Sequence, residues 1–215
     1  MKKTLLALSL AAAATQPALA DGEEAASEEA SGPFSVTLAV TSDYRFRGQS
    51  QNSRDFAFQG SLDYATEGGF YVGVWASNID FSDTGDTSTE VEIDFYAGYS
   101  FALGEGTEAG VKATYYYYPD SPFVIGYDYW EFQASLSHDL GGATLSAELN
   151  YSPDYFFETG TAVAAAAGIE VPLWDKFTAS GHIGHQWIDD NFAFGTPDWM
   201  YWDLGIGVEL APKEL

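Results

Sequence analysis

The chain has no cysteine, and it has few basic residues. Without thiols it can form no disulfide and no thiolate metal site, and it cannot use cysteine in catalysis. Only 8 Lys and Arg stand against 32 Asp and Glu, for a formal net charge of -24. Because phosphate recognition depends on clustered Lys and Arg, the composition excludes nucleic acid as an expected partner.

Long apolar runs are also missing beyond the first twenty residues. The one such run, residues 4–14, follows Met1-Lys2-Lys3 and precedes Ala18-Leu19-Ala20. A basic start, an apolar middle and small residues at the end are typical of a secretory signal peptide. We therefore expect residues 1–20 to be removed after Ala20 and the protein to be exported. A single membrane-spanning helix is the weaker interpretation, since such a helix needs roughly 20 apolar residues.

Residues 21–33 are acidic and small, with no bulky apolar side chain. Such a segment cannot bury enough apolar surface to order itself, which predicts a disordered acidic leader. From residue 34 to residue 215 the sequence has a uniform texture without a linker. We expect this part to form one domain.

Apolar and small polar residues alternate through ten segments of that domain. In the first, Phe34, Val36, Leu38, Val40, Tyr44 and Phe46 fall on one face, with Ser35, Thr37, Ala39, Thr41, Asp43 and Arg45 on the other. Because a strand points successive side chains to opposite sides, this period predicts two-faced strands. The ten segments are 34–47, 55–65, 69–79, 90–102, 108–118, 128–139, 142–152, 161–171, 177–188 and 199–210.

The connections between these segments alternate in length. Five are long and polar (49–54, 80–90, 119–127, 152–160 and 189–198), and four are short turns (66–69, 103–107, 140–142 and 172–176). In an up-and-down chain, all the long loops then emerge at one end. An even strand number with this loop asymmetry is typical of bacterial outer-membrane proteins. The predicted fold class is all-β, a single up-and-down antiparallel transmembrane β-barrel of about ten strands, within the range 8–12.

The polar faces indicate which side of each strand looks outward. A soluble barrel covers its exterior with long charged side chains, whereas here only Lys112, Lys176 and Lys213 are basic after Arg54. We therefore expect the apolar faces to meet lipid and the polar faces to line a lumen. The segment 69–79 is ambiguous. The side chains that face outward in it are either Phe70, Val72 and Val74 or Tyr71, Trp75 and Ile79. In other segments, we expect Trp130, Trp187 and Trp202 to lie near the long loops.

The same parity predicts which charged side chains line the lumen. Carboxylates in such positions favour cations in a pore. The alternative is that the basic members pair with the acids and plug the barrel. Ten strands lie close to the eight-stranded barrel that side chains just fill, so any pore should be narrow. The predicted lumen residues are Asp43, Arg45, Arg47, Asp63, Glu92, Asp94, Lys112, Glu131, Asp139, Glu148, Glu170, Asp203 and Glu209.

Several stretches resemble the TorF-type porin family of proteobacteria. The clearest is Ser35-Val-Thr-Leu-Ala-Val-Thr-Ser-Asp-Tyr-Arg-Phe-Arg-Gly-Gln-Ser50, and residues 58–64, 69–78, 92–99 and 154–156 add to it. The resemblance implies an outer-membrane barrel. It implies no established substrate and no catalytic residues.

Three further motifs suggest chemistry but lack the required spacing. His182 and His185 lie three residues apart, so on a strand they point to opposite faces. The acidic loop with Asp80, Asp83 and Asp86 lacks the turn spacing of a calcium site. No Gly-x-Ser-x-Gly nucleophile elbow accompanies His138 and Asp139. We expect no enzyme, no metal and no cofactor.

The sequence thus predicts an outer-membrane, porin-like barrel that passes small solutes or cations through a narrow acidic lumen. Its expected partners are the outer-membrane lipid bilayer, the permeating solutes and the barrel-assembly machinery. Three alternatives stay open. They are a closed structural or ligand-binding barrel acting through its long external loops, a soluble periplasmic binding barrel with an apolar interior, and a lipid-modifying enzyme.

Overall fold

The computed structural model describes residues 24–27, 32–119, 121, 126–174, 176–194 and 198–208. The predicted signal peptide, most of the acidic leader and Glu209 lie outside the described residues. Within the leader, the structure has one short strand, β1 (Glu24–Ser27).

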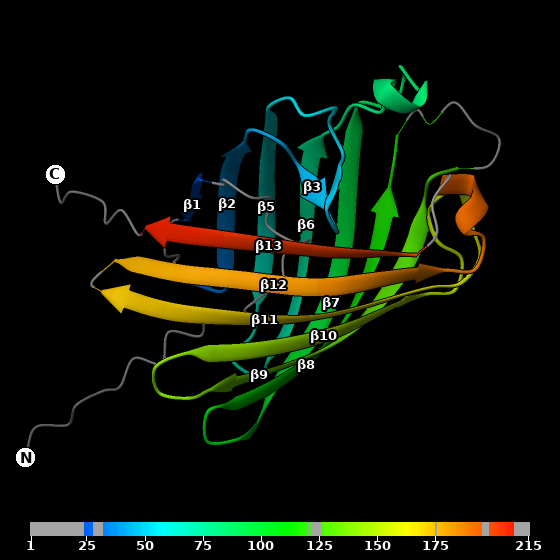
Figure 1. Cartoon of the computed structure of the whole chain (residues 1–215). Helices are drawn as coiled ribbons and strands as arrows, with labels where there is room; N and C mark the ends of the chain where they lie inside the picture. Colours follow the sequence, from blue (N-terminus) through cyan, green and yellow to red (C-terminus); the bar gives the residue numbers. More distant parts are fainter. Residues whose placement is uncertain are drawn as a thin grey trace, which may run out of the picture.

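In these described ranges the chain forms one antiparallel sheet and a small separate hairpin (Figure 1). Each strand of the sheet pairs with the strands before and after it, which confirms the predicted all-β antiparallel meander. Three short 3-10 turns, η1 (Ser82–Thr84), η2 (Phe156–Glu158) and η3 (Asn191–Phe194), lie in the connections. After β1, the sheet contains β2 (Phe34–Thr41), β5 (Ala57–Ala65), β6 (Phe70–Asn78), β7 (Val91–Gly104), β8 (Thr107–Tyr117), β9 (Tyr129–Asp139), β10 (Thr144–Ser152), β11 (Ala162–Trp174), β12 (Phe177–Ile188) and β13 (Trp199–Val208).

The first predicted strand is wrong beyond residue 41. β2 ends at Thr41, whose hydroxyl accepts the backbone N–H of Asp43, and the chain then leaves the sheet. It forms the hairpin of β3 (Arg45–Phe46) and β4 (Gln49–Ser50). Because the strand is interrupted, residues after Thr41 no longer follow the inward–outward alternation of side chains in β2. Tyr44 is therefore buried in the interior instead of sharing the outer face of Phe34.

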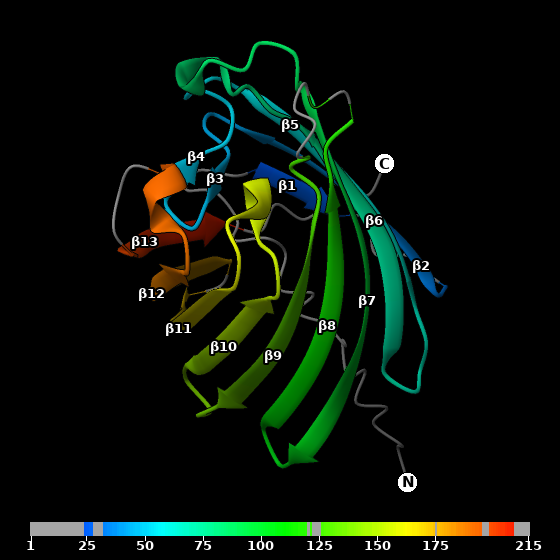
Figure 2. The same ribbon diagram turned by 90° about the vertical axis from the view of Figure 1, so that its right-hand side faces the viewer.

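The sheet curls strongly along its length. β12 and β13 cross in front of β5 and β6, and the turned view shows the hairpin on the concave side (Figures 1 and 2). β1 pairs with the edge of β2 that faces away from β5, with Glu24 opposite Val40. Within the described ranges, no ladder joins β13 to β1 or β2.

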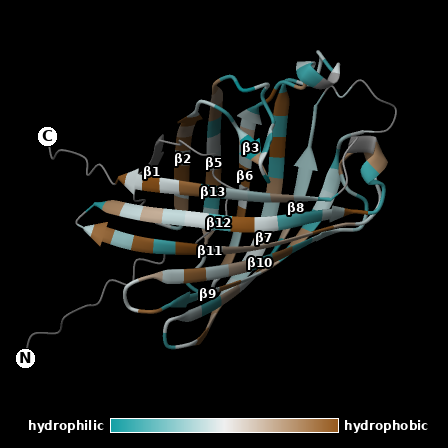
Figure 3. Cartoon of the chain, viewed as in Figure 1, coloured by the Kyte–Doolittle hydropathy of each residue, from teal (hydrophilic) through white to brown (hydrophobic). Residues whose placement is uncertain are grey.

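Burial is inverted relative to a soluble protein. Apolar side chains on the convex face are exposed, with Leu38 at 63% and Leu204 at 73%, and the alternation shows as bands along the strands (Figure 3). On the concave face, polar side chains such as Thr41, Asn150 and Gln186 are almost completely buried. Soluble domains bury their large apolar residues and expose the polar ones. The apolar faces of the strands therefore lie on the convex side and the polar faces on the concave side.

The ambiguous strand β6 follows the same rule. Phe70 and Val72 are exposed on the convex face, whereas Trp75 and Ser77 are buried on the concave face. The ambiguity arose because both faces of this strand carry aromatic residues. One predicted turn is also shorter than expected, since β11 continues to Trp174 through a register shift near Pro172.

All long connections lie at one end of the sheet, here called the long-loop end, and the short ones lie at the other, the short-turn end. Exposed aromatic side chains gather near both ends. Trp130, Trp187 and Trp202 are close to the long loops. Phe34, Phe70, Phe101, Trp174 and Phe177 are close to the short turns.

Gly69 lies in the short turn between β5 and β6, and its close approach to β7 provides a test of the β6–β7 register. Its φ is 91°, and a Cβ at this position would collide with the backbone carbonyl oxygen of Ser100 on β7. Gly85 has a similar φ of 96° but open space around it. We predict that Gly85→Ala costs only the left-handed backbone strain, about 1–2 kcal/mol of unfolding free energy. Gly69→Ala should cost clearly more, measured by urea unfolding, and equal losses would contradict the β6–β7 register.

Candidate functional site

The β3–β4 hairpin lies inside the curl of the sheet and carries the predicted lumen residue Arg47 at its tip. Arg47 and Gly48 both have positive φ, 50° and 80°, as a two-residue hairpin turn of type I′ requires. A Cβ on Gly48 would approach Cβ of Tyr201 on β13 to 3.0 Å, so the turn packs closely against that strand. Arg47 is an unusual residue at this φ, and its backbone strain is held by the contacts of its side chain.

The Arg47 guanidinium bridges strands that are far apart in sequence. It donates to Oε1 of Gln186 on β12 at 2.9 Å and forms an ion pair with Glu131 on β9 at 2.8 Å. Its carbonyl oxygen accepts a hydrogen bond from the indole N–H of Trp199 at 3.0 Å. Burial is the largest effect and lowers the pKa of Arg47, but the Glu131 carboxylate and the neighbouring Tyr155, Tyr116 and Tyr129 together outweigh it and raise that pKa above its usual value. Arg47 therefore keeps its charge and crosses the interior as a buried cation.

Tyr44, just before the hairpin, ties it to the opposite wall of the interior. Its hydroxyl donates to Oε1 of Glu92 on β7 at 2.8 Å, and its ring meets Trp75 of β6 edge-on. The amide oxygen of Asn52 accepts the backbone N–H of Tyr44 at 3.0 Å. Burial, and then the charge of Glu92, raise the pKa of Tyr44, so the hydroxyl stays protonated and can donate. The hairpin is thereby fixed to both halves of the sheet.

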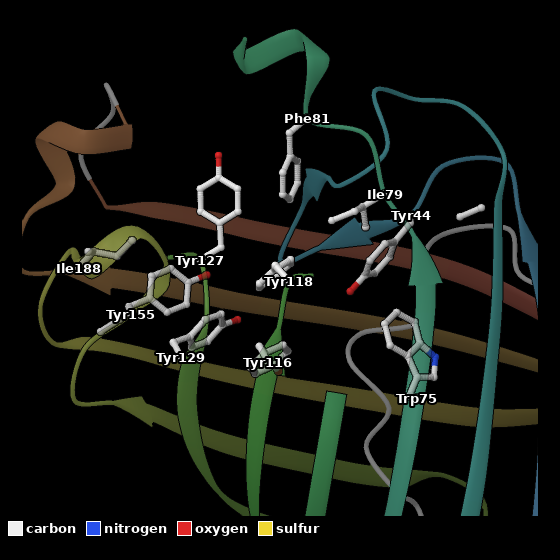
Figure 4. Packing of buried hydrophobic residues seen from close by; sticks show 12 residues of the cluster. Tyr44, Trp75, Ile79, Phe81, Tyr116, Tyr118, Tyr127, Tyr129, Tyr155 and Ile188 are labelled. Atoms are coloured by element: carbon white, nitrogen blue, oxygen red, sulfur yellow. The ribbon is translucent and has the colours of Figure 1, made fainter. Parts of the chain in front are cut away.

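A cluster of buried aromatic side chains fills the long-loop end around this hairpin (Figure 4). The rings of Tyr116 and Tyr129 stack with centroids 4.3 Å apart, and those of Tyr127 and Phe156 stack at 4.5 Å. Tyr155, in the loop after β10, packs edge-on against Tyr129, and burial raises its pKa to about 12. The long-loop end is therefore constricted by the hairpin and by these rings.

Toward the short-turn end, the concave face is more accessible. His182 on β12 is 41% exposed and bonds the carboxylate of Asp203 on β13 at 2.8 Å. Glu148 accepts hydrogen bonds from the side-chain amides of Gln133 and Asn150. Solvent thus reaches polar side chains from this end, while their counterparts at the long-loop end are buried.

The predicted lumen residues fall into three groups. Arg47, Glu92, Asp94 and Glu131 are buried together at the long-loop end. Asp63, Lys112, Glu148 and Asp203 lie lower on the concave face and are partly exposed. The third group lies at the two ends of the sheet. Asp43 pairs with the exposed Arg45 at the long-loop end, Asp139 accepts the backbone N–H of Gly141 in a short turn, and Glu170 is exposed. Glu209 lies outside the described residues.

Neutral residues complete this network, and sequence reasoning missed them. Gln186 and Asn150 are absent from the predicted lumen set because that set contains only charged side chains. Parity identifies both, since Asn150 lies two residues from the predicted lumen residue Glu148, and Gln186 lies four residues from His182, which contacts the predicted lumen residue Asp203. Tyr44 and Phe46 were assigned to the wrong face for the reason given above.

The histidine pair and the acidic loop noted in the sequence make local structural contacts. His182 faces inward to Asp203, whereas the His185 ring packs at a tilt of 41° against the exposed Trp187, so the two imidazoles lie on opposite faces. Asp86 accepts backbone N–H bonds from Ser88 and Thr89 within its own loop. Burial opposes its charge, but hydrogen bonding by the side chains and backbone of Thr89 and Ser88 lowers its pKa to about 2. Among the residues described, no three His, Asp or Glu side chains converge as metal ligands, and no helix is long and apolar enough to cross a membrane.

The buried Arg47–Glu131 pair yields a prediction about stability. Arg47→Met leaves the Glu131 carboxylate buried and unpaired, which should cost about 3–5 kcal/mol of unfolding free energy. Arg45→Met is the matched control, because Arg45 is 43% exposed and its pair with Asp43 should be worth about 0–1 kcal/mol. The double change Arg47→Met with Glu131→Leu should recover most of the loss. Urea unfolding measures all three, and equal effects of Arg45→Met and Arg47→Met would show that the ion pair is not buried.

Comparison with known proteins gives a family but no activity. A family model described as "Bacterial protein of unknown function (Gcw_chp)" matches residues 25–213, a range that includes every strand from β2 to β13. No curated protein matches the chain. The resemblance to TorF-type porins therefore stays a prediction.

Proposed function

The chain belongs to the Gcw_chp family of bacterial proteins of unknown function, and for it we propose an outer-membrane, porin-like β-barrel. In this proposal, residues 1–20 direct export, the sheet closes into a transmembrane barrel of ten strands, and small solutes or cations pass through its acidic lumen. No catalytic residue is assigned. The lipid bilayer and the barrel-assembly machinery are the proposed partners.

The inverted burial of the sheet carries this proposal. Large apolar side chains such as Leu38, Leu204 and Ile206 are exposed along the convex face, between two zones rich in exposed aromatic residues. An outward apolar band flanked by aromatic girdles is the surface that outer-membrane barrels present to lipid. In water, the same surface would be a large apolar patch that favours aggregation.

In a membrane, the sheet would have to close into a barrel. An open sheet edge in hydrocarbon leaves backbone N–H and C=O groups without partners, which only a closed barrel avoids. The curl of the sheet and the contacts of Arg47 with β9 and β12 support closure. In the proposed ten-stranded barrel, β13 pairs with the outer edge of β2 and takes the place that β1 occupies there.

The interior supports a narrow, cation-preferring passage. Carboxylates outnumber basic groups on the concave face, and solvent reaches them from the short-turn end. Fixed negative charge favours a partly dehydrated cation and repels anions. The hairpin and the aromatic cluster constrict the long-loop end, so conductance should be small.

A second candidate is a closed barrel that acts through its long external loops. The buried Arg47–Glu131 ion pair favours it, because the pair crosses the interior at the constriction. The two candidates agree on fold and membrane and differ only in conduction.

If the sheet spans a membrane, the stability lost by placing a charged residue on the convex face of β13 should depend on the depth of that residue in the bilayer. Leu204 lies in the middle of this strand and Val208 at its short-turn end, and both are exposed. Leu204→Arg should destabilise the protein folded in lipid vesicles by about 2–4 kcal/mol, and the control Val208→Arg by about 0–1 kcal/mol. Folding titrations in urea with vesicles present measure both. Small and equal effects would show that the convex face meets water.

Passage through the lumen predicts a specific electrical behaviour. In planar bilayers, the purified full-length protein should show a small single-channel conductance, and its reversal potential in a KCl gradient should indicate cation preference. Anion preference would contradict the acidic lumen. Absence of conductance from correctly folded protein would favour the closed barrel.

A further inference from the structure

The outer edge of β2, which faces away from β5, is covered by the short strand β1 (Figure 1). Their antiparallel ladder runs from Glu24 opposite Val40 to Ser27 opposite Thr37. Every ladder from β2 to β13 is also antiparallel and joins successive strands of the sheet. In the up-and-down order of the sheet, β13 therefore runs opposite to β2 and in the same direction as β1. The two strands fit the same edge in the same orientation, and they cannot both occupy residues 37–40.

β1 is unsuited to be a strand of the closed barrel. It has four residues, whereas a transmembrane strand needs about 9–11. Its sequence, Glu-Ala-Ala-Ser, contains no large apolar residue. Retained between β2 and β13, it would pair with β13 in parallel and make the strand number odd, whereas bacterial outer-membrane barrels of one chain have an even number of antiparallel strands. The place of β1 in the sheet thus belongs to the open form.

The edge that β1 covers needs protection in water. β2 has the sequence Phe-Ser-Val-Thr-Leu-Ala-Val-Thr, with no charged residue and no proline, and Val and Thr make up half of it. A bare edge of this kind is a template on which strands of other chains can pair. A very short strand from an acidic segment blunts such an edge, because it offers few backbone groups to a further strand and its charge repels other copies.

We propose that β1 is a guard strand, which covers the outer edge of β2 while the sheet is open and is displaced by β13 when the sheet closes in the membrane. The inference rests on the proposed function and adds the step that precedes closure. The exchange is favourable because β1 pairs with four of the eight residues of β2, whereas β13 has ten residues and can form the longer ladder.

Two engineered disulfides on opposite edges of β2 test the exchange. The natural chain has no cysteine, so each variant contains a single pair of thiols. Ala26→Cys with Leu38→Cys joins β1 to the outer edge at a register pair. The control, Val36→Cys with Leu62→Cys, joins β2 to β5 in a ladder that the open and closed sheets share. Each disulfide is formed in urea, and the full-length protein is then diluted into lipid vesicles with or without a reductant.

The link between positions 26 and 38 should lower the yield of folded protein several-fold, and the reductant should restore it. The shift of folded protein on unheated SDS gels measures this yield. The control should fold equally well oxidised and reduced. Equal yields from the oxidised and reduced 26–38 variant would overturn the displacement of β1. If the natural chain and the control also fail to enter vesicles, the membrane barrel itself is contradicted, and the exchange with it.

Deletion of residues 24–27 tests the protection of the edge without relying on insertion. The deleted protein should aggregate several-fold faster than the natural chain after dilution from urea into lipid-free buffer, as measured by light scattering. An unchanged rate would overturn the guard role. Faster aggregation in a protein that stays out of vesicles would refute the membrane proposal and leave edge protection by β1 standing.

Discussion

Every other feature of this structure depends on the two-residue period of its antiparallel strands. Because successive side chains point to opposite faces, one sequence can present Leu204 and Ile206 outward and Asp203 and Gly205 inward. A shift of one residue in any ladder would exchange the two environments along that strand. The register is thus fixed by the chemistry of both faces at once.

The inner face imposes a stricter condition than the outer one. Apolar side chains on the convex face need only be apolar, whereas each polar group inside must find a partner of the right kind and at the right distance. Arg47 illustrates this, since its position is set by Glu131, Gln186 and Trp199 together. The positive φ of Arg47 is tolerated because these three contacts hold the turn.

The strands and their orientation could be predicted from the sequence, because they follow from local alternation. The segment 177–188, for example, coincides with β12. The hairpin could not be predicted, because the apolar alternation of Phe34 resumes at Tyr44 and Phe46 after the single polar position Ser42, although the chain leaves the sheet after Thr41. The pairing of Arg47 with Glu131 depends on how far the sheet curls, which no local pattern encodes.

The two side-chain partners of Arg47 lie 84 and 139 residues further along the chain. Contacts of such large sequence separation form late, because the intervening loop must first be closed. The guanidinium of Arg47 cannot reach both partners until β9 and β12 lie in the sheet. Burial of this cation at the long-loop end is therefore expected to follow formation of the sheet.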